Sequence, residues 1–119
     1  MTTILSQVDP SAEIACTLPI NQASDRLDSL QALVGDRLVA TERDPNRLRI
    51  TITRAGHDDL EGEVRAWAQE EKGCCAFLGF AVESRPETVT LEIASPPDAG
   101  PTLDAIEWMF RAANRVGAA

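Results

Sequence analysis

The sequence is short of basic residues. Its 119 residues contain 11 Lys and Arg against 19 Asp and Glu, a formal net charge of -8. Nucleic acids and anionic membranes are bound by clustered Lys and Arg, so this balance argues against both partners. The sequence also lacks an apolar run of the ~18 residues that a membrane span requires, and residues 1–11 lack the basic and apolar regions of a signal peptide. We therefore expect a cytoplasmic protein.

Histidine is nearly absent as well, since His57 is the only one. A monomeric site with two imidazole ligands or bases is thereby excluded. The phosphate-binding glycine motifs, the G-x-S-x-G motif and the H-E-x-x-H motif are also missing. His57 itself lies beside Asp58 and Asp59, where a capping or solvent-exposed role explains it. An enzyme is therefore the least supported class of function, although the sequence alone does not decide the matter.

What is present describes one domain. A length of 119 residues with 44% hydrophobic residues suits a single globular core. Residues 1–11 are mostly polar, contain Pro10 and show no periodicity, which predicts a flexible N-terminal arm. We expect residues 12–119 to form a single α+β domain.

The hydrophobic periodicity predicts the order β-α-β-β-α-β-β-α. The pattern β-α-β-β-α-β is the connectivity of the ferredoxin-like sandwich, an antiparallel sheet with helices on one face. We expect this fold with an extra strand and a C-terminal helix. The expected strands are 13–20, 38–42, 47–54, 76–83 and 89–94, and the expected helices are 21–34, 58–72 and 102–116.

The second face of such a sheet, or an open edge, is often covered by another copy of the chain. The expected C-terminal helix carries Trp108, Met109 and Phe110, which give it apolar residues beyond a single stripe. It can cover the sheet within one chain or across a dimer, and we expect a homodimer.

Cysteine occurs three times, an odd number. Cys74 and Cys75 are adjacent, and a disulfide between neighbours closes a short, strained ring. Reduced adjacent thiols instead suit a soft ion such as Zn(II), Cu(I), Hg(II) or trivalent arsenic. Cys16 is expected to point inward from the strand at 13–20 and can supply a third sulfur.

Three thiolates make a trigonal site for a soft metal or metalloid. They also make three-quarters of a tetrahedral zinc site, with His57, Glu71 or water as the fourth ligand. Zinc or another thiophilic metal is therefore the expected cofactor.

Two observations favour inert cysteines instead. Cys16 is flanked by Ile14 and Leu18 and suits plain core packing, as buried cysteine often does. The helix C-terminus, with Glu70 and Glu71 nearby, disfavours a free thiolate at the pair, although a bound cation would reverse this effect.

The residues Glu71, Cys74, Cys75, Phe77 and Leu78 form the pattern E-x-x-C-C-x-F-L. With Cys16, this pattern resembles a group of small uncharacterised bacterial proteins that are loosely associated with heavy-metal resistance. Relatives often carry Pro directly after the pair, where Ala76 stands here. The resemblance implies no established activity, but it implies that the three cysteines act together.

Three hypotheses follow. The leading one is a cytoplasmic domain that binds a soft metal or metalloid through Cys16, Cys74 and Cys75. The second is a dimeric structural or interaction module with buried, inert cysteines. The third is a thiol redox sensor.

Overall fold

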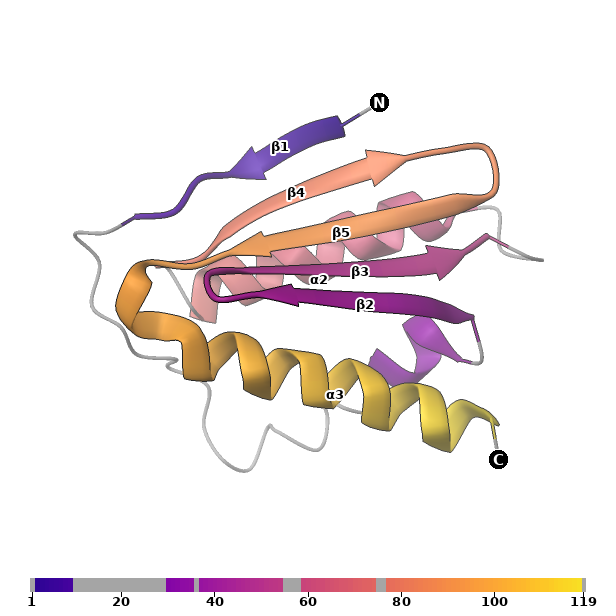
Figure 1. The fold of residues 1–119 in the computed structure, drawn as a ribbon. Helices are drawn as coiled ribbons and strands as arrows, with labels where there is room; N and C mark the ends of the chain where they lie inside the picture. Colours follow the sequence, from indigo (N-terminus) through magenta and orange to yellow (C-terminus); the bar gives the residue numbers. More distant parts are fainter. Residues whose placement is uncertain (1, 10–29, 36, 55–58, 75–76, 119) are drawn as a thin grey trace.

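In a computed structural model, the protein forms a five-stranded antiparallel sheet with helices against one face (Figure 1). The structure describes residues 2–9, 30–35, 37–54, 59–74 and 77–118, without the side chains of Cys74 and residues 115–118. The strand order is β1-β4-β5-β3-β2. The predicted α+β class, the antiparallel sheet and the additional C-terminal helix are thus confirmed.

The two hairpins follow the predicted alternation. β2, Leu38–Asp44, turns through Pro45 and Asn46 into β3, Arg47–Thr53. β4, Gly79–Ser84, turns into β5, Thr88–Ala94, and β5 is the central strand. In β3 and β5 every second side chain is apolar, and these side chains are buried on one face of the sheet. They are Leu48, Ile50, Ile52, Val89, Leu91 and Ile93.

The first strand lies elsewhere than we expected. β1, Thr2–Ser6, is an edge strand that pairs antiparallel with β4, with Thr3 opposite Val82. The prediction of a flexible arm over 1–11 is therefore wrong for this segment. Its β-branched residues favour a strand, but it is short and only half-buried, so it carries little periodic signal. The strand predicted at 13–20 lies outside the described residues.

The helix before β2 ends as its sequence indicated. Residues 30–34 are helical, and Gly35 follows with φ of +55°. The Gly35 N–H donates to the Gln31 carbonyl at 2.8 Å, which is how a left-handed residue closes a helix. The start predicted at Asn21 lies outside the described residues.

The second helix, α2, spans Leu60–Cys74 and packs mainly against β4 and β1. Its inner stripe follows the expected spacing of three and four residues. The stripe consists of Leu60, Val64, Trp67, Ala68 and Glu71, all buried.

The last helix, α3, spans Gly100–Ala118 after a short 3-10 turn, η2, at Pro97–Ala99. It packs against β2 and β3 of its own sheet, so it covers the chain to which it belongs. Phe110 on α3 meets Trp67 on α2 edge to face, with ring centroids 5.1 Å apart. None of the helices within the described residues is long and apolar enough to cross a membrane.

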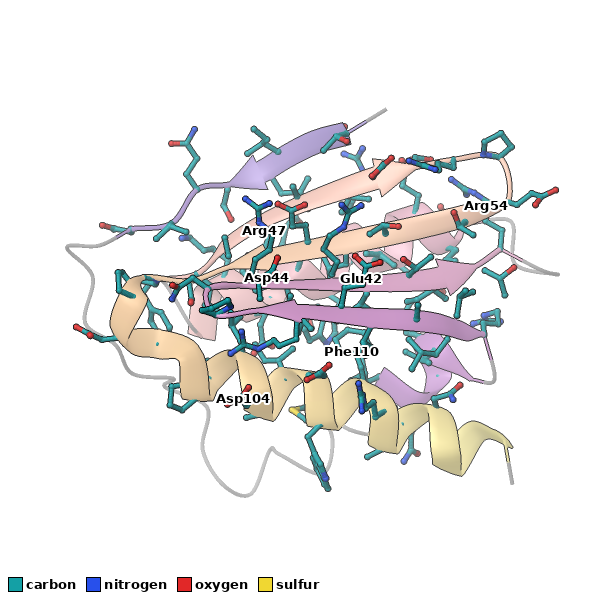
Figure 2. All side chains as sticks on the ribbon, viewed as in Figure 1. Glu42, Asp44, Arg47, Arg54, Asp104 and Phe110 are labelled. Atoms are coloured by element: carbon teal, nitrogen blue, oxygen red, sulfur yellow. The ribbon has the colours of Figure 1, made fainter. Side chains whose placement is uncertain are left out.

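The other face of the sheet is polar and carries cross-strand pairs (Figure 2). Arg47 pairs with Glu92 at 3.3 Å, and Arg49 pairs with Glu83 at 3.1 Å. Such pairs across a sheet are typical of a face in contact with water.

Candidate functional site

The candidate site lies at the C-terminal end of α2. Cys74 is the last residue of this helix. The side chain of Cys74 and the residues Cys16, Cys75 and His57 lie outside what the structure describes. Within the described part of the chain, no group of three or more His, Cys, Asp or Glu side chains is placed to hold a metal ion. The site must therefore be built from its described neighbours.

Glu71 is the first of these neighbours. It is 9% exposed, and among the described residues it is the only charged side chain that is buried. Buried carboxylates are rare because loss of water destabilises their charge. Glu71 continues the inner stripe of α2, and Cys74 follows it by three positions along the chain.

The described chain resumes at Phe77, two residues after Cys75, and is well anchored there. Phe77 and Leu78 are fully buried. Lys72 lies in the last turn of α2, and its Nζ donates to the Leu78 carbonyl at 2.6 Å and to the Gln7 carbonyl at 3.1 Å. One ammonium thus joins the end of α2 to the start of β4 and to the N-terminal segment.

The N-terminal segment after β1 lies against the same chain. The Asp9 N–H donates to the Phe77 carbonyl at 3.2 Å. Gly79 permits this close approach, because a Cβ added there would lie 2.6 Å from the Val8 nitrogen. Residues 7–9 and residues 77–79 are therefore fixed side by side, two residues beyond Cys75.

A ferredoxin-like sheet places its first strand beside the fourth, so a strand at 13–20 in that position would bring Cys16 near the pair only in the right register. The partner of β4 is instead Thr2–Ser6. Cys16 follows the anchored Asp9 by seven residues, a chain length that spans at most ~25 Å. Both neighbours of β4 in the sheet are therefore other segments, β1 and β5, and Cys16 lies outside the described residues.

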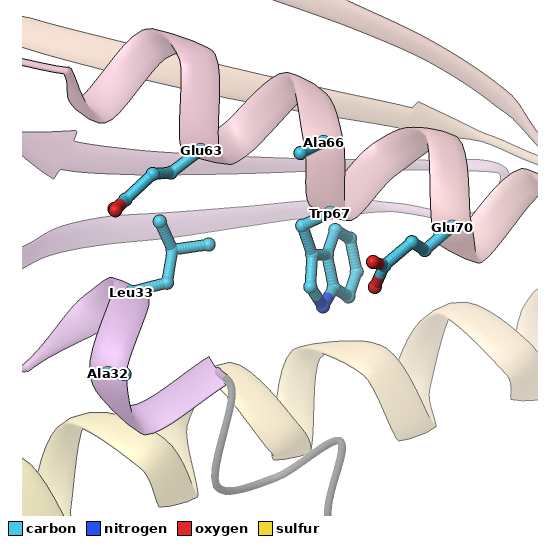
Figure 3. Close-up of a pocket in the computed structure, with 6 residues that line it drawn as sticks. All are labelled: Ala32, Leu33, Glu63, Ala66, Trp67 and Glu70. Carbon is cyan, nitrogen blue, oxygen red and sulfur yellow. The ribbon is translucent and has the colours of Figure 1, made fainter.

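A second feature, which we did not predict, is a hollow of about 250 Å3 between α2 and residues 30–34. Figure 3 shows Trp67 in its wall, with Glu63 and Glu70 to either side and Leu33 opposite. The two glutamates are seven positions apart on α2 and so share a side of the helix. The spacing was visible in the sequence, but the opposing helix that closes the hollow was not. Its lining contains no nucleophile paired with a base, so it does not suggest catalysis.

One carboxylate has a shifted pKa. The hydrogen bond from the Arg85 side chain, and then the charges of Arg85 and Arg49, hold the pKa of Glu83 below its ordinary value. Glu83 therefore stays ionised on the polar face of the sheet. A carboxylate of this kind stabilises positive charge and is a poor proton donor.

The chain matches no protein-family model, no curated protein and no solved structure.

Proposed function

We propose that this protein binds a soft metal or metalloid in the cytoplasm, through the thiolates of Cys16, Cys74 and Cys75. The observation that carries the proposal is the setting of the cysteine pair. Cys74 is the last residue of α2, and along the chain the pair follows the buried carboxylate Glu71 by three and four positions. A hydrogen bond from Lys72 holds Leu78, shortly after the pair in the sequence. A soft-metal site needs donors held by rigid elements, and this setting supplies such elements.

The donor set suits thiophilic ions. Thiolates select Zn(II), Cu(I), Hg(II) and trivalent arsenic over hard cations. Cys74 and Cys75 would provide two adjacent sulfurs, and Cys16 would complete a trigonal set. Glu71 or His57 is the candidate fourth ligand for zinc, which prefers four donors in a tetrahedron.

The charge around the pair supports metal binding over nucleophilic chemistry. The C-terminal end of α2 carries partial negative charge, and Glu70 and Glu71 add to it. A free thiolate is disfavoured there, whereas a divalent cation is attracted. The net charge of -8 of the whole chain acts in the same direction.

The test is a titration of the reduced protein with Zn(II), Cu(I), Hg(II) and arsenite, with the free thiols counted after each addition. We expect one equivalent of at least one of these ions to protect all three thiols. The variants Cys16→Ser and Cys75→Ser should each lower the affinity. If the three thiols react equally fast with and without every ion, the proposal is wrong.

A second function is favoured by one observation. Phe77 and Leu78, two and three positions after Cys75, are fully buried, which is typical of an apolar core segment. In that case the cysteines are inert packing residues of a structural or interaction module. The double variant Cys74→Ser, Cys75→Ser would then lose stability through lost packing and show no change in metal binding.

A further inference from the structure

The outer side of α3 carries a large exposed aromatic residue. Trp108 is 64% exposed, although Phe110, two positions later, is fully buried. Trp108 lies on the side of α3 opposite the buried stripe that begins at Leu103 and continues through Ile106. Trp108 is thus exposed although α3 covers its own sheet. Tryptophan is enriched at interfaces between proteins relative to the rest of the surface.

The neighbours of Trp108 leave room for a close partner. Ala105 is exposed and Ala112 is half-buried, and both lie about one turn from Trp108 on the same side of the helix. Small residues next to a large one allow the backbones of two helices to approach while the large side chain fills the gap between them.

Beside Trp108, a two-fold rotation brings an acidic residue of one copy opposite a basic residue of the other. Asp104 and Arg111 are seven positions apart, two turns of α3, and so lie along one border of this side. In an antiparallel pair of α3 helices centred between positions 107 and 108, each Asp104 comes opposite Arg111 of the partner subunit. Opposite charges therefore meet at both ends of the contact.

Both charged groups remain accessible for such a contact. Asp104 pairs with Arg43 at 3.1 Å and is still 70% exposed. Arg111 pairs with Glu107 at 3.1 Å, donates to the Thr41 hydroxyl at 2.9 Å and is still 55% exposed. Each can add a further partner without leaving those it has.

We propose that α3 is the interface of a homodimer, in which it packs antiparallel against α3 of a second copy with the two Trp108 side chains at the centre. The interface is isologous, as expected for a two-fold dimer. A single pair of helices buries little surface, so the dimer is reversible, with a dissociation constant in the micromolar range.

The free edge of β2 is a poorer interface between copies. If two β2 strands paired antiparallel about Glu42, the Glu42 side chains of the two copies would lie opposite each other. If they paired about Arg43, Glu42 of one copy would lie opposite Asp44 of the other. Either arrangement brings like charges together, which is unfavourable. The polar face of the sheet already pairs its charges within one chain. Of these described surfaces, α3 alone combines an exposed large aromatic with charges that are complementary under the two-fold rotation.

The test measures mass by sedimentation equilibrium at concentrations up to about 100 µM, well above a micromolar dissociation constant. A reductant and a chelator are present, so that neither a disulfide nor a metal contributes. The result is then independent of the proposed metal binding. We expect the mass to rise with concentration toward twice the 12.9 kDa of the monomer.

Two sets of variants identify the interface. Trp108→Ser should raise the dissociation constant at least ~tenfold. Ile4→Ser, the matched control on β1, removes a side chain that is equally exposed at 65% and should leave the dimer intact. Asp104→Arg should weaken the dimer by placing like charges together, and the double variant Asp104→Arg, Arg111→Asp should restore it.

Three results would each overturn the proposal. The first is a wild-type protein that stays monomeric over the whole range. The second is an equal loss of dimer in Ile4→Ser and Trp108→Ser. The third is a double charge variant that dimerises no better than Asp104→Arg alone. As a control, the thermal unfolding of each variant is measured to check that the fold is intact.

Discussion

Single residues decide how the end of α2 is shaped. Glu71 places a carboxylate in the interior one turn before the cysteine pair. Lys72 donates hydrogen bonds to the carbonyl oxygens of Leu78 and Gln7. A neighbouring carboxylate, Glu70, lies on the exposed side of the same helix. These two glutamates share their charge and differ in burial, so each serves as the control for the other.

Replacing Glu71 with Gln should weaken metal binding by about 10- to 100-fold, the range typical of ligands and their supporting groups. Gln keeps the size of the side chain and removes the charge that attracts a cation. Glu70→Gln should change the affinity by a much smaller factor. The measurement is competition for Zn(II) with a coloured chelator. An equal loss of Zn(II) affinity in both variants would mean that only the overall charge matters and that Glu71 is neither a ligand nor a support of the site.

Gly35 and Gly73 give a pair of substitutions with opposite expected signs. A Cβ at either position meets no atom within 4 Å, so only the backbone matters. Gly35 has φ of +55°, where an L-residue is strained, and Gly35→Ala should lower the free energy of unfolding by ~1–2 kcal/mol. Gly73 is within α2, and Gly73→Ala should raise it by up to ~1 kcal/mol. Urea denaturation checks both, and a stabilised Gly35→Ala would contradict the left-handed cap.

At the scale of elements, the sequence predicted the strands and helices whose apolar residues recur with a regular period. β3 and β5 alternate strictly, and the inner stripe of α3 follows helical spacing, so their buried residues were foreseen. β1 was missed because an edge strand of five residues, none of them buried, leaves almost no pattern. The hollow at Trp67 was missed because it forms only where residues 30–34 pack opposite α2. This is a tertiary contact that the hydrophobic pattern of either segment does not reveal.

The two aromatic residues of α3 should behave very differently when truncated. Phe110 is fully buried against Trp67, and Phe110→Ala should cost ~3–5 kcal/mol of stability. Trp108→Ala, two positions away and exposed, should change the stability of the monomer by less than ~0.5 kcal/mol. Both are measured by denaturant unfolding at low protein concentration, where the dimer is absent. A large loss for Trp108→Ala would mean that this side chain supports its own fold.

Gly79 controls how the N-terminal segment lies against the sheet. Gly79→Ala places a Cβ 2.6 Å from the Val8 backbone nitrogen, so one of the two chains must move. We expect a loss of ~1–3 kcal/mol of stability, the usual cost of overpacking. Hydrogen exchange at the Asp9 amide should also become faster. Ala81→Gly, in the same strand, is the control and should leave Asp9 protected.

At the scale of the whole molecule, acid stability should depend on Glu83. Its pKa is held below the ordinary value by the Arg85 hydrogen bond and by Arg49. The stabilisation is complete above the unfolded-state value of about 4.3 and is lost as the pH falls through the lower folded-state value. The slope of stability against pH below about pH 5 should therefore be smaller in Glu83→Gln. The control is Glu87→Gln at the exposed turn of the same hairpin. A Glu83→Gln slope that equals the wild-type slope would contradict this account.

The pairing of β1 with β4 has a consequence for synthesis of the chain. β1 is synthesised before its partner strand, Gly79–Ser84, which follows the hairpin of β2 and β3 and the helix α2 along the chain. The hairpin of β2 and β3 can form meanwhile from neighbouring residues, whereas closing a loop between distant strands is slow. The N-terminal strand therefore waits unpaired during translation and joins the sheet late. A bulky fusion at the N-terminus would interfere at that last step, while the rest of the domain was already folded.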